Sequence, residues 1–589
     1  MIKSGYSLFE RASRTFRNHP TLSKLLLVST LSVITWINLV ASSDGRPYNG
    51  DKHIHSSSDE GKKKKVVVLG TGCAGTSFLR NLSNPSYDVH VVSPRNYFVF
   101  SPLLPILTCG TVEARSIIDP IRTILLKKSY DVHFEEANCY KIDPEKKKVY
   151  CKSSKNTNVR GEKDEFALDY DYLVIAMGAR VNTFNTPGVV EYAHFLKEVE
   201  DAQRIRKSVL DSFERASLPS LSEEERKRIL HFVVVGGGPA GVEFAAEFHD
   251  FFHEDLLKLY PHIKDYVKIT LIEAADHILN TYDNKITAFA EEKFQRDGIH
   301  VKTGSMVVQV TDTEISAKER KTGEVSNTPY GMVVWATGNG TRPEIMAFMK
   351  QIGQANRHAL ATDEWLRVGR CENVYALGDC ATVNQRQVME DIAFIFNKAD
   401  KNKSGTLNLK DFQEIVDDIL ERYPQVKLHL KRRKMRNFSA LLKNSQESAQ
   451  NQAIEIENFK SALSEVDSQI INLPATAQVA GQQGEYLADC FNRMEECEKY
   501  PEGPLRFRGS GRHQFHPFRY NNLGKFAPLG GKQVAIQSPG DWVWIGRSTR
   551  WIWYSVYTSK LASWRARTSV ISDWVKRFIF GRDSSRIRD

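Results

Sequence analysis

The chain has 589 residues, with 81 Lys and Arg against 71 Asp and Glu, which gives a formal net charge of +10. Hydrophobic residues make up 41% and charged residues 26% of the sequence, which excludes a wholly disordered chain, a collagen and a protein with many membrane spans. The eight cysteines are too few for a disulfide scaffold, and no two form a C-x-x-C pair. The length predicts three or four domains.

The first 41 residues are rich in basic and hydroxylated residues. Five bases, the last of them Lys24, stand against the single acid Glu10, a composition typical of an organellar transit peptide. An apolar run over residues 25–41 follows and is barely long enough to span a bilayer. An import signal with a sorting or anchor segment is favoured over a secretory signal and a disordered leader.

A glycine-rich turn follows the first apolar strand, residues 65–69. Gly70, Gly72 and Gly75 form G-x-G-x-x-G, and helical residues 76–81 and a second strand at 88–92 complete a βαβ unit. In this pattern the glycines allow a tight turn, a close approach to a pyrophosphate and packing of helix on strand. The acid that usually ends the second strand is replaced by Ser93, which leaves the ribose contact open.

A second copy of this pattern begins at residue 231. Gly236, Gly238 and Gly241 again join a strand to a helix, and the next strand, residues 267–273, ends in Glu273. A carboxylate there accepts hydrogen bonds from the ribose diol and repels a 2′-phosphate, so we expect NADH to be preferred over NADPH.

Three further strands end in small-residue turns and fit the same plan. Residues 172–179 contain Gly178, residues 331–338 end in Gly338, and residues 373–381 place Asp379 after an apolar strand. A buried strand with a tight turn explains each segment alone, but their order beside the two glycine motifs favours an α/β fold with two Rossmann-like dinucleotide-binding domains.

About ninety residues after Ala381 are not required by this plan. Within them, residues 400–411 match the twelve-residue EF-hand loop, with Gly405 at the sharp turn. Position 12 is an Asp instead of a Glu, so we expect weaker Ca²⁺ binding; a charged helix–loop–helix without metal is the alternative. A complete second loop is not evident, which leaves a lone hand or pairing across a homodimer. The expected Ca²⁺ ligands are Asp400, Asn402, Ser404, Thr406, Asn408 and Asp411.

The C-terminal residues 545–589 combine aromatic and basic side chains. Trp564, Ile571, Trp574, Val575 and Phe578 recur near helical spacing, which predicts a helix in a membrane interface; a basic helix packed on its own domain or on a dimer partner is the alternative. This segment carries +7 and residues 1–41 carry +4, so the rest of the chain sums to −1. The basic balance therefore indicates import and a membrane surface, and no nucleic acid.

Five strings extend the likeness beyond the glycine motifs, and with them the chain resembles the type II (alternative) NADH:ubiquinone oxidoreductases, in particular the external, calcium-responsive kind of plant mitochondria. The strings are Ser93-Pro-Arg-Asn-Tyr-Phe98, Ser101-Pro-Leu-Leu-Pro105, Cys109-Gly-Thr-Val-Glu-Ala-Arg115, Pro474-Ala-Thr-Ala-Gln-Val-Ala480 and Gln482-Gln-Gly-Glu-Tyr-Leu-Ala488.

The resemblance implies bound FAD, hydride transfer from NADH, two-electron reduction of ubiquinone without proton pumping, and a peripheral position on the intermembrane-space side of the mitochondrial inner membrane. The resemblance places Glu243 between nicotinamide and flavin, and Gln478 and Gln482 at the quinone. The alternative for the two glutamines is an amphipathic helix on which they are solvated. Gly481 replaces a residue that is often larger in relatives, which predicts a looser quinone site. A reductase with a ferredoxin-like acceptor and a Ca²⁺-responsive membrane adaptor on an inactive scaffold are the competing hypotheses.

These features divide the chain into seven parts. They are a leader (1–60), a first FAD-binding part (61–229), an NADH-binding domain (230–355), a second FAD-binding part (356–381), the EF-hand insertion (382–470), a FAD and quinone segment (471–544) and a membrane-association region (545–589).

Overall fold

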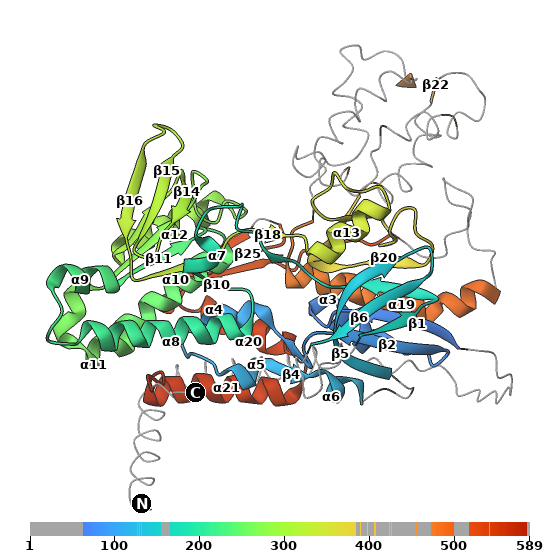
Figure 1. Cartoon of the computed structure of the whole chain (residues 1–589), viewed down its shortest axis with the longest axis horizontal. Helices are drawn as coiled ribbons and strands as arrows, with labels where there is room; N and C mark the ends of the chain where they lie inside the picture. Colours follow the sequence, from blue (N-terminus) through green and yellow to red (C-terminus); the bar gives the residue numbers. More distant parts are fainter. Residues whose placement is uncertain are drawn as a thin grey trace, which may run out of the picture.

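The computed structural model describes residues 63–126, 132–154, 165–384, 473–499, 517–540 and 542–585, with a few isolated residues and two short strands elsewhere (Figure 1). The predicted leader and all of the calcium loop except Thr406 and Leu407 lie outside the described residues.

The first glycine motif lies in a seven-stranded sheet of order β20-β8-β1-β2-β5-β6-β7. Its strands from β20 to β5 are parallel, and β5, β6 and β7 are antiparallel. Because β1 is covered on both faces, it reads as an apolar run without alternation. The strands are β1 (Lys64–Leu69), β2 (Tyr87–Ser93), β5 (Val132–Asp143), β6 (Lys148–Ser153), β7 (Glu165–Asp169), β8 (Tyr172–Ile175) and β20 (Val374–Ala376).

Two helices that are distant in sequence lie together against this sheet, α3 (Cys73–Asn81) and α19 (Ala477–Lys499). Their contact is close because Gly484 of α19 has no side chain: a Cβ there would lie 2.3 Å from the carbonyl oxygen of Ala74. The segment that follows the insertion is therefore part of the first dinucleotide unit.

The second glycine motif lies in a parallel five-stranded sheet of order β10-β17-β11-β12-β13. These strands are β10 (Ala193–Phe195), β17 (Met332–Trp335), β11 (His231–Val235), β12 (Lys268–Ile272) and β13 (Ile299–Lys302). A three-stranded antiparallel sheet follows, with β14 (Ser305–Val310), β15 (Glu314–Glu319) and β16 (Val325–Pro329). Together with the first sheet, this confirms the predicted α/β fold with two Rossmann-like units.

The helix after the second glycine turn, α10 (Pro239–Phe251), continues through a π-helical turn, η2 (Phe252–Leu256), into α11 (Leu257–Leu259). This extension explains why Glu273 follows Gly241 at more than the usual interval. The other helices of this unit are α8 (Val199–Ala216), α9 (Glu223–Ile229), η3 (Pro261–Tyr266) and α12 (Asn284–Arg296).

The remaining elements are short and lie within the two units, between them or in the insertion. They are β3 (Tyr97–Val99), η1 (Ser101–Leu103), α4 (Leu104–Thr108), α5 (Ala114–Ile117), β4 (Ile118–Pro120), α6 (Ile121–Leu125), β9 (Arg180–Val181), α7 (Val189–Tyr192), β18 (Asn339–Gly340), α13 (Pro343–Gln351), β19 (Leu360–Thr362), η4 (Gly378–Cys380), β21 (Ala381–Val383), β22 (Thr406–Leu407) and β23 (Ile454–Glu455).

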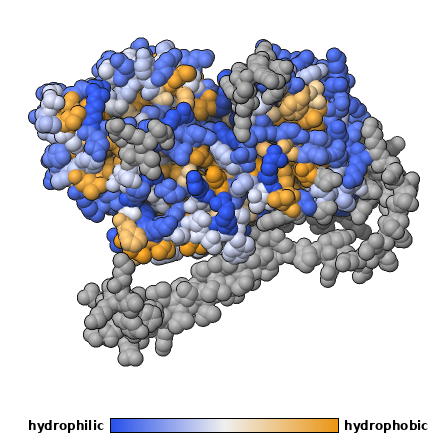
Figure 2. All heavy atoms as spheres, turned by 60° about the horizontal axis from the view of Figure 1, so that its bottom comes forward, coloured by the Kyte–Doolittle hydropathy of each residue, from blue (hydrophilic) through white to orange (hydrophobic). Residues whose placement is uncertain are grey.

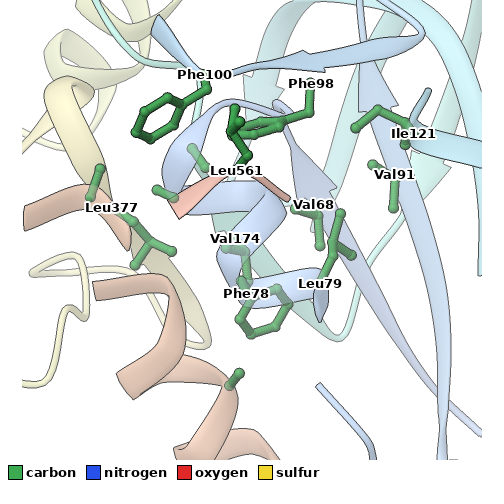
Figure 3. Packing of buried hydrophobic residues seen from close by; sticks show 14 of the residues in the cluster. Val68, Phe78, Leu79, Val91, Phe98, Phe100, Ile121, Val174, Leu377 and Leu561 are labelled. Carbon is green, nitrogen blue, oxygen red and sulfur yellow. The ribbon is translucent and has the colours of Figure 1, made fainter. Parts of the chain in front are cut away.

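The C-terminal part forms an antiparallel sheet and two helices, the last of which runs along the lower edge of the described part of the molecule in Figure 1. The elements are β24 (Lys525–Pro528), β25 (Val534–Ser538), β26 (Trp542–Gly546), α20 (Thr549–Lys560) and α21 (Trp564–Phe580). Leu561, between the two helices, is 1% exposed and joins the core cluster of the first sheet beside Phe98 and Phe100 (Figure 3). The C-terminal tail, residues 542–585, is therefore packed against the rest of the fold.

Among the residues the structure describes, no helix combines the length and apolar character needed to cross a bilayer.

Candidate active site at the two dinucleotide turns

The first glycine turn has a backbone that only glycine fits. Gly70 has φ +100°, and a Cβ on it would lie 2.4 Å from the carbonyl oxygen of Ala176. A Cβ on Gly75 would lie 2.0 Å from the oxygen of Gly70, whereas nothing lies within 4 Å of the corresponding position on Gly72. The space at Gly72, beside the uncapped N-terminus of α3, fits the pyrophosphate of a dinucleotide.

The second turn repeats this geometry. Gly236 has φ +113°, a Cβ on Gly241 would lie 1.9 Å from the oxygen of Gly236, and Gly238 faces open space. The N-terminus of α10 also lacks a side-chain cap, so its free N–H groups fit a second pyrophosphate.

The two turns differ in the residue that ends the following strand. In the first unit, the hydroxyls of Ser93 and Thr71 are hydrogen-bonded at 2.8 Å. In the second, the carboxylate of Glu273 accepts hydrogen bonds from Gly237 N at 2.5 Å and Ala275 N at 2.7 Å. The carboxyl group of Glu273 therefore lies against the second glycine turn, whereas Ser93 offers a hydroxyl at the first.

The other predicted cofactor residues lie at turns around these motifs. Gly178 (φ +64°) faces open space, and Gly338 (φ +77°) packs so closely on Asn182 that a side chain would not fit. Asp379 in η4 lies 3.6 Å from Lys197 Nζ, which balances its charge. The neighbouring Gly378 N–H donates to the buried side chain of Gln483 at 2.7 Å, so α19 holds this turn in place.

Glu243 lies on α10 behind the second turn and is buried, and its Oε1 has no hydrogen-bond partner. Burial, and then the charge of Glu247 one helical turn later, raises the pKa of Glu243 well above its usual value. Burial therefore favours the protonated, neutral form of Glu243. An unpaired buried carboxyl is costly for a fold and is typical of a functional group.

Two tyrosines that the sequence patterns did not single out lie near this carboxyl. Burial and the charge of Glu243 raise the pKa values of both Tyr282 and Tyr557. Tyr282 donates to the Phe526 carbonyl at 2.8 Å, and the ammonium of Lys525 lies 5.4 Å from its ring centroid. No spacing rule marks these residues, because β24, α20 and the segment after β12 meet only in the folded chain.

Gln478 and Gln482 lie on the first turns of α19 and bind the loop before β24. Gln478 accepts from the Tyr520 hydroxyl and from Leu523 N at 3.2 Å. Gln482 accepts from Asn521 N at 2.9 Å and donates to Asn521 O at 2.8 Å. The alternative of freely solvated glutamines is therefore wrong. Gly481, between them, faces open space.

Cys73, at the first glycine turn, and Cys109, at the end of α4, are unsuited to thiol redox chemistry. Every cysteine the structure describes is a free thiol. Burial raises the pKa of Cys73 to about 11, and Cys109 behaves similarly, with a pKa of about 12. A thiol that stays protonated is a poor nucleophile. The geometry thus favours a flavin reductase without a dithiol over a disulfide reductase.

Residues 64–393 match the family model described as "Pyridine nucleotide-disulphide oxidoreductase", and residues 522–583 match the model described as "NDH2 C-terminal domain". The chain is 64% identical over 585 residues to the "External alternative NAD(P)H-ubiquinone oxidoreductase B2, mitochondrial" of Arabidopsis thaliana, covering 99% of this chain and 100% of the relative. The chain belongs to the alternative NAD(P)H–ubiquinone oxidoreductase family.

More distant relatives agree with this assignment. The external alternative NADH–ubiquinone oxidoreductase of Yarrowia lipolytica is 34% identical, covering 97% of this chain and 89% of the relative. The solved structure of NDH2 from Plasmodium falciparum in complex with NADH is 31% identical with a TM-score of 0.77, covering 89% of this chain and all of that one. The predicted family resemblance is confirmed.

The C-terminal aromatic residues divide into two groups that the sequence did not separate. Trp553 is buried and Trp574 packs on Tyr554 with ring centroids 4.1 Å apart, so the prediction that Trp574 faces a membrane is wrong. Trp564 and Phe578 are exposed on the other side of α21. Helix spacing alone could not separate them, because α20 covers only one side of α21.

Proposed function

We propose that this chain is an FAD-dependent NADH:ubiquinone oxidoreductase that works on the intermembrane-space surface of the mitochondrial inner membrane and is regulated by Ca²⁺. The observation that carries the redox function is the pair of glycine turns, each open at its second glycine, with the buried carboxyl of Glu243 behind the second. When bound, FAD supplies the carrier that accepts hydride from NADH and passes two electrons to quinone.

The residues of this chain bind the two dinucleotides, and Glu243 holds a proton. Gly70, Gly72, Gly75, Ser93, Gly178 and Asp379 hold FAD in this proposal, and Gly236, Gly238, Gly241, Glu273 and Gly338 hold NADH. Because burial keeps Glu243 protonated, its carboxyl can donate a proton to a quinone oxygen as the quinone takes up electrons. Gln478 and Gln482 shape the quinone site through the loop at Tyr520 to Leu523.

An outward apolar stripe on α21 supports a membrane position. Trp564, Ile571, Val575 and Phe578 follow one another at helical intervals, and each is 47% exposed or more. Figure 2, in which the underside of Figure 1 comes forward, shows apolar residues at the surface among hydrophilic ones. Exposed Arg565 and Lys576 lie on the same helix, and this combination favours the head-group region of an anionic membrane.

A short strand pair in the insertion supports the Ca²⁺ site. β22 covers positions 7 and 8 of the predicted loop and pairs antiparallel with β23, with Leu407 opposite Ile454. Ca²⁺ loops of this kind place a backbone carbonyl at position 7 on the ion. The pairing favours a partner segment within the same chain over a lone hand or a hand paired across a dimer.

The function is tested by mixing purified protein with NADH and then with a short-chain ubiquinone, with Ca²⁺ or with EGTA. We expect NADH to bleach the yellow protein and quinone to restore its colour. Colourless protein, or bleached protein that a ferredoxin but not quinone reoxidises, would overturn the proposal.

Two substitutions test the Ca²⁺ loop in opposite directions. Asp400→Asn removes a ligand charge and should raise the Ca²⁺ concentration needed for half-maximal effect. Asp411→Glu supplies the longer arm for bidentate binding and should lower it. Equal Ca²⁺ dependence in both variants and the parent would remove the regulatory part of the proposal and leave the redox part standing.

A further inference from the structure

A cluster of two histidines and two carboxylates lies on β2 and β5, where these strands begin. Asp88 and His90 are two residues apart on β2, and His133 and Glu135 are two residues apart on β5, so each pair shares a sheet face. His90 is in register with His133, and their rings stack with centroids 4.8 Å apart. None of these residues belongs to the dinucleotide turns, which follow the opposite ends of the strands.

The nitrogen and oxygen atoms of three of these side chains converge. The carboxylate of Asp88 lies 3.4 Å from His90 Nε2 and 3.7 Å from His133 Nε2. One ligand atom from each of the three residues lies within 4.8 Å of the other two. A tetrahedral Zn²⁺ with bonds of about 2.0–2.1 Å keeps its ligand atoms about 3.3 Å apart. The observed separations require only small side-chain movements to reach that geometry.

A metal-binding histidine normally donates its second ring N–H to a carboxylate or a backbone carbonyl, and Glu135 is placed to be that partner of His90. Its Oε1 lies 3.3 Å from His90 Nδ1. A carboxylate on Nδ1 fixes the tautomer with the proton on that nitrogen, which leaves Nε2 with its lone pair toward Asp88. This outer carboxylate distinguishes the cluster from a surface histidine that only pairs with one acid.

The cluster is also accessible. A cavity of about 590 Å³ is lined by Asp88 and His133, with Asp169 and Asp171 balancing Lys63 and Lys65. His133 is 55% exposed at its side chain, whereas His90 is only 15% exposed. An ion can therefore enter from solvent, and water can complete its coordination.

We propose that Asp88, His90 and His133 form a binding site for a borderline transition-metal dication, above all Zn²⁺, with Glu135 as the outer hydrogen-bond partner of His90 and water as the fourth ligand. Imidazole and carboxylate ligands in tetrahedral arrangement suit Zn²⁺ and disfavour Ca²⁺. The bound ion joins β2 to β5 at the end of the sheet away from the cofactor turns. It stabilises the first unit and does not take part in hydride transfer.

The test uses the full-length, FAD-loaded protein, stripped with EDTA and then kept in excess Ca²⁺ so that the calcium loop is filled. Zn²⁺ binding is measured by titration calorimetry, and the melting temperature is measured with and without Zn²⁺. We expect one tight Zn²⁺ per chain and a higher melting temperature in its presence. The absence of a saturable one-to-one site would overturn the proposal.

Variants identify the ligands. His133→Gln and Asp88→Asn each remove a ligand and should weaken Zn²⁺ binding by at least about a hundredfold, while Glu135→Gln should weaken it by about ten- to a hundredfold. His277→Gln is the matched control, because His277 is an exposed histidine whose Nδ1 lies 3.2 Å from the carboxylate of Glu291. It should bind Zn²⁺ as the parent does.

Two results would contradict the site. One is unchanged Zn²⁺ affinity in His133→Gln, and the other is an equal loss in His277→Gln. Because His133 is half exposed, His133→Gln should keep its FAD and its quinone reductase activity without Zn²⁺, which separates loss of the site from misfolding. A zinc-edge X-ray absorption spectrum of the loaded protein should show imidazole and oxygen ligands only; a sulfur ligand would also overturn the assignment.

Discussion

The two glycine turns have nearly the same backbone but different surroundings. In both, the third glycine packs on the carbonyl oxygen of the first, so that a Cβ would lie 2.0 Å from it in the first turn and 1.9 Å in the second. The strand that follows the first glycine turn ends in the hydroxyl of Ser93, and the strand that follows the second ends in the carboxylate of Glu273. The same local fold therefore presents different chemical groups at the two turns, supplied by residues outside the motif.

The helices after the two turns are also covered differently. α3 is covered by α19, through the close approach at Gly484. α10 is held from below by Arg582, which follows α21 and has no exposed side-chain surface. Its guanidinium contacts Glu247 at 3.5 Å, Glu254 at 2.9 Å and Asp255 at 2.7 Å. The C-terminal tail is thus tied to the helix that carries Glu243.

The largest expected effect comes from placing the same methyl group in each turn. Gly75→Ala and Gly241→Ala each force a Cβ onto a backbone oxygen, which neither turn can move cheaply. We expect Gly75→Ala to be purified without FAD. Gly241→Ala should remain yellow but lose at least about a hundredfold in kcat/KM for NADH, or about 2.7 kcal/mol. Absorbance and NADH kinetics check this; FAD loss in both variants would contradict the separate roles of the turns.

Arg582→Met should break the buried ion-pair anchor between the tail and the second unit. Burial alone would lower the pKa of Arg582, but the charges of Glu247 and its neighbours outweigh burial and raise it, so the guanidinium is permanently charged. Removing one partner of a buried charge cluster costs about 3–5 kcal/mol. We expect a lower melting temperature for Arg582→Met than for the parent in thermal unfolding.

The control for this variant lies on α21, shortly before Arg582. Lys576 is 68% exposed and lies 3.9 Å from Asp573, so Lys576→Met should change the melting temperature little. An equal loss of melting temperature in Arg582→Met and Lys576→Met would contradict a specific anchor at Arg582.

These contrasts also explain what could be predicted from the sequence. The glycine turns and their strands were predictable because positive φ at Gly70 and Gly236 and apolar runs such as β1 are local requirements. The contacts of Tyr557 and Arg582 were not, because they depend on where the tail docks. The same holds for the division of the tail between buried Trp553 and exposed Trp564.

In the second unit, Glu243 is a buried acid with one oxygen that lacks a hydrogen-bond partner, and its protonation predicts a pH dependence. Because the folded-state pKa of Glu243 is raised, its contribution to stability is complete below the unfolded pKa and is lost as pH rises through the folded pKa. Glu243→Gln should therefore become more stable relative to the parent as pH rises. The parent's rate of quinone reduction should fall over the same range, whereas the rate of Glu243→Gln should be low and flat.

Glu247→Gln sharpens this prediction. The charge of Glu247 is the second cause of the raised pKa of Glu243, so its removal should move the alkaline fall in quinone reduction to lower pH. Rates of flavin reoxidation measured across pH in the three proteins check this. A fall at the same pH in Glu243→Gln and in the parent would show that another group titrates.

The smallest expected effect concerns the residue that differs most plainly between the units. Glu273→Gln removes the charge that would repel a 2′-phosphate while keeping the size of the side chain that binds Gly237 N and Ala275 N. A charge pair near a protein surface is worth about 1–4 kcal/mol, so we expect the ratio of kcat/KM for NADPH to that for NADH to rise about tenfold or more. Ser93→Ala, the corresponding change in the first unit, should leave this ratio unchanged. Because both substrates are compared in one protein, general damage to the turn cancels, and an unchanged ratio in Glu273→Gln would mean that the carboxylate orders the turn without selecting the nucleotide.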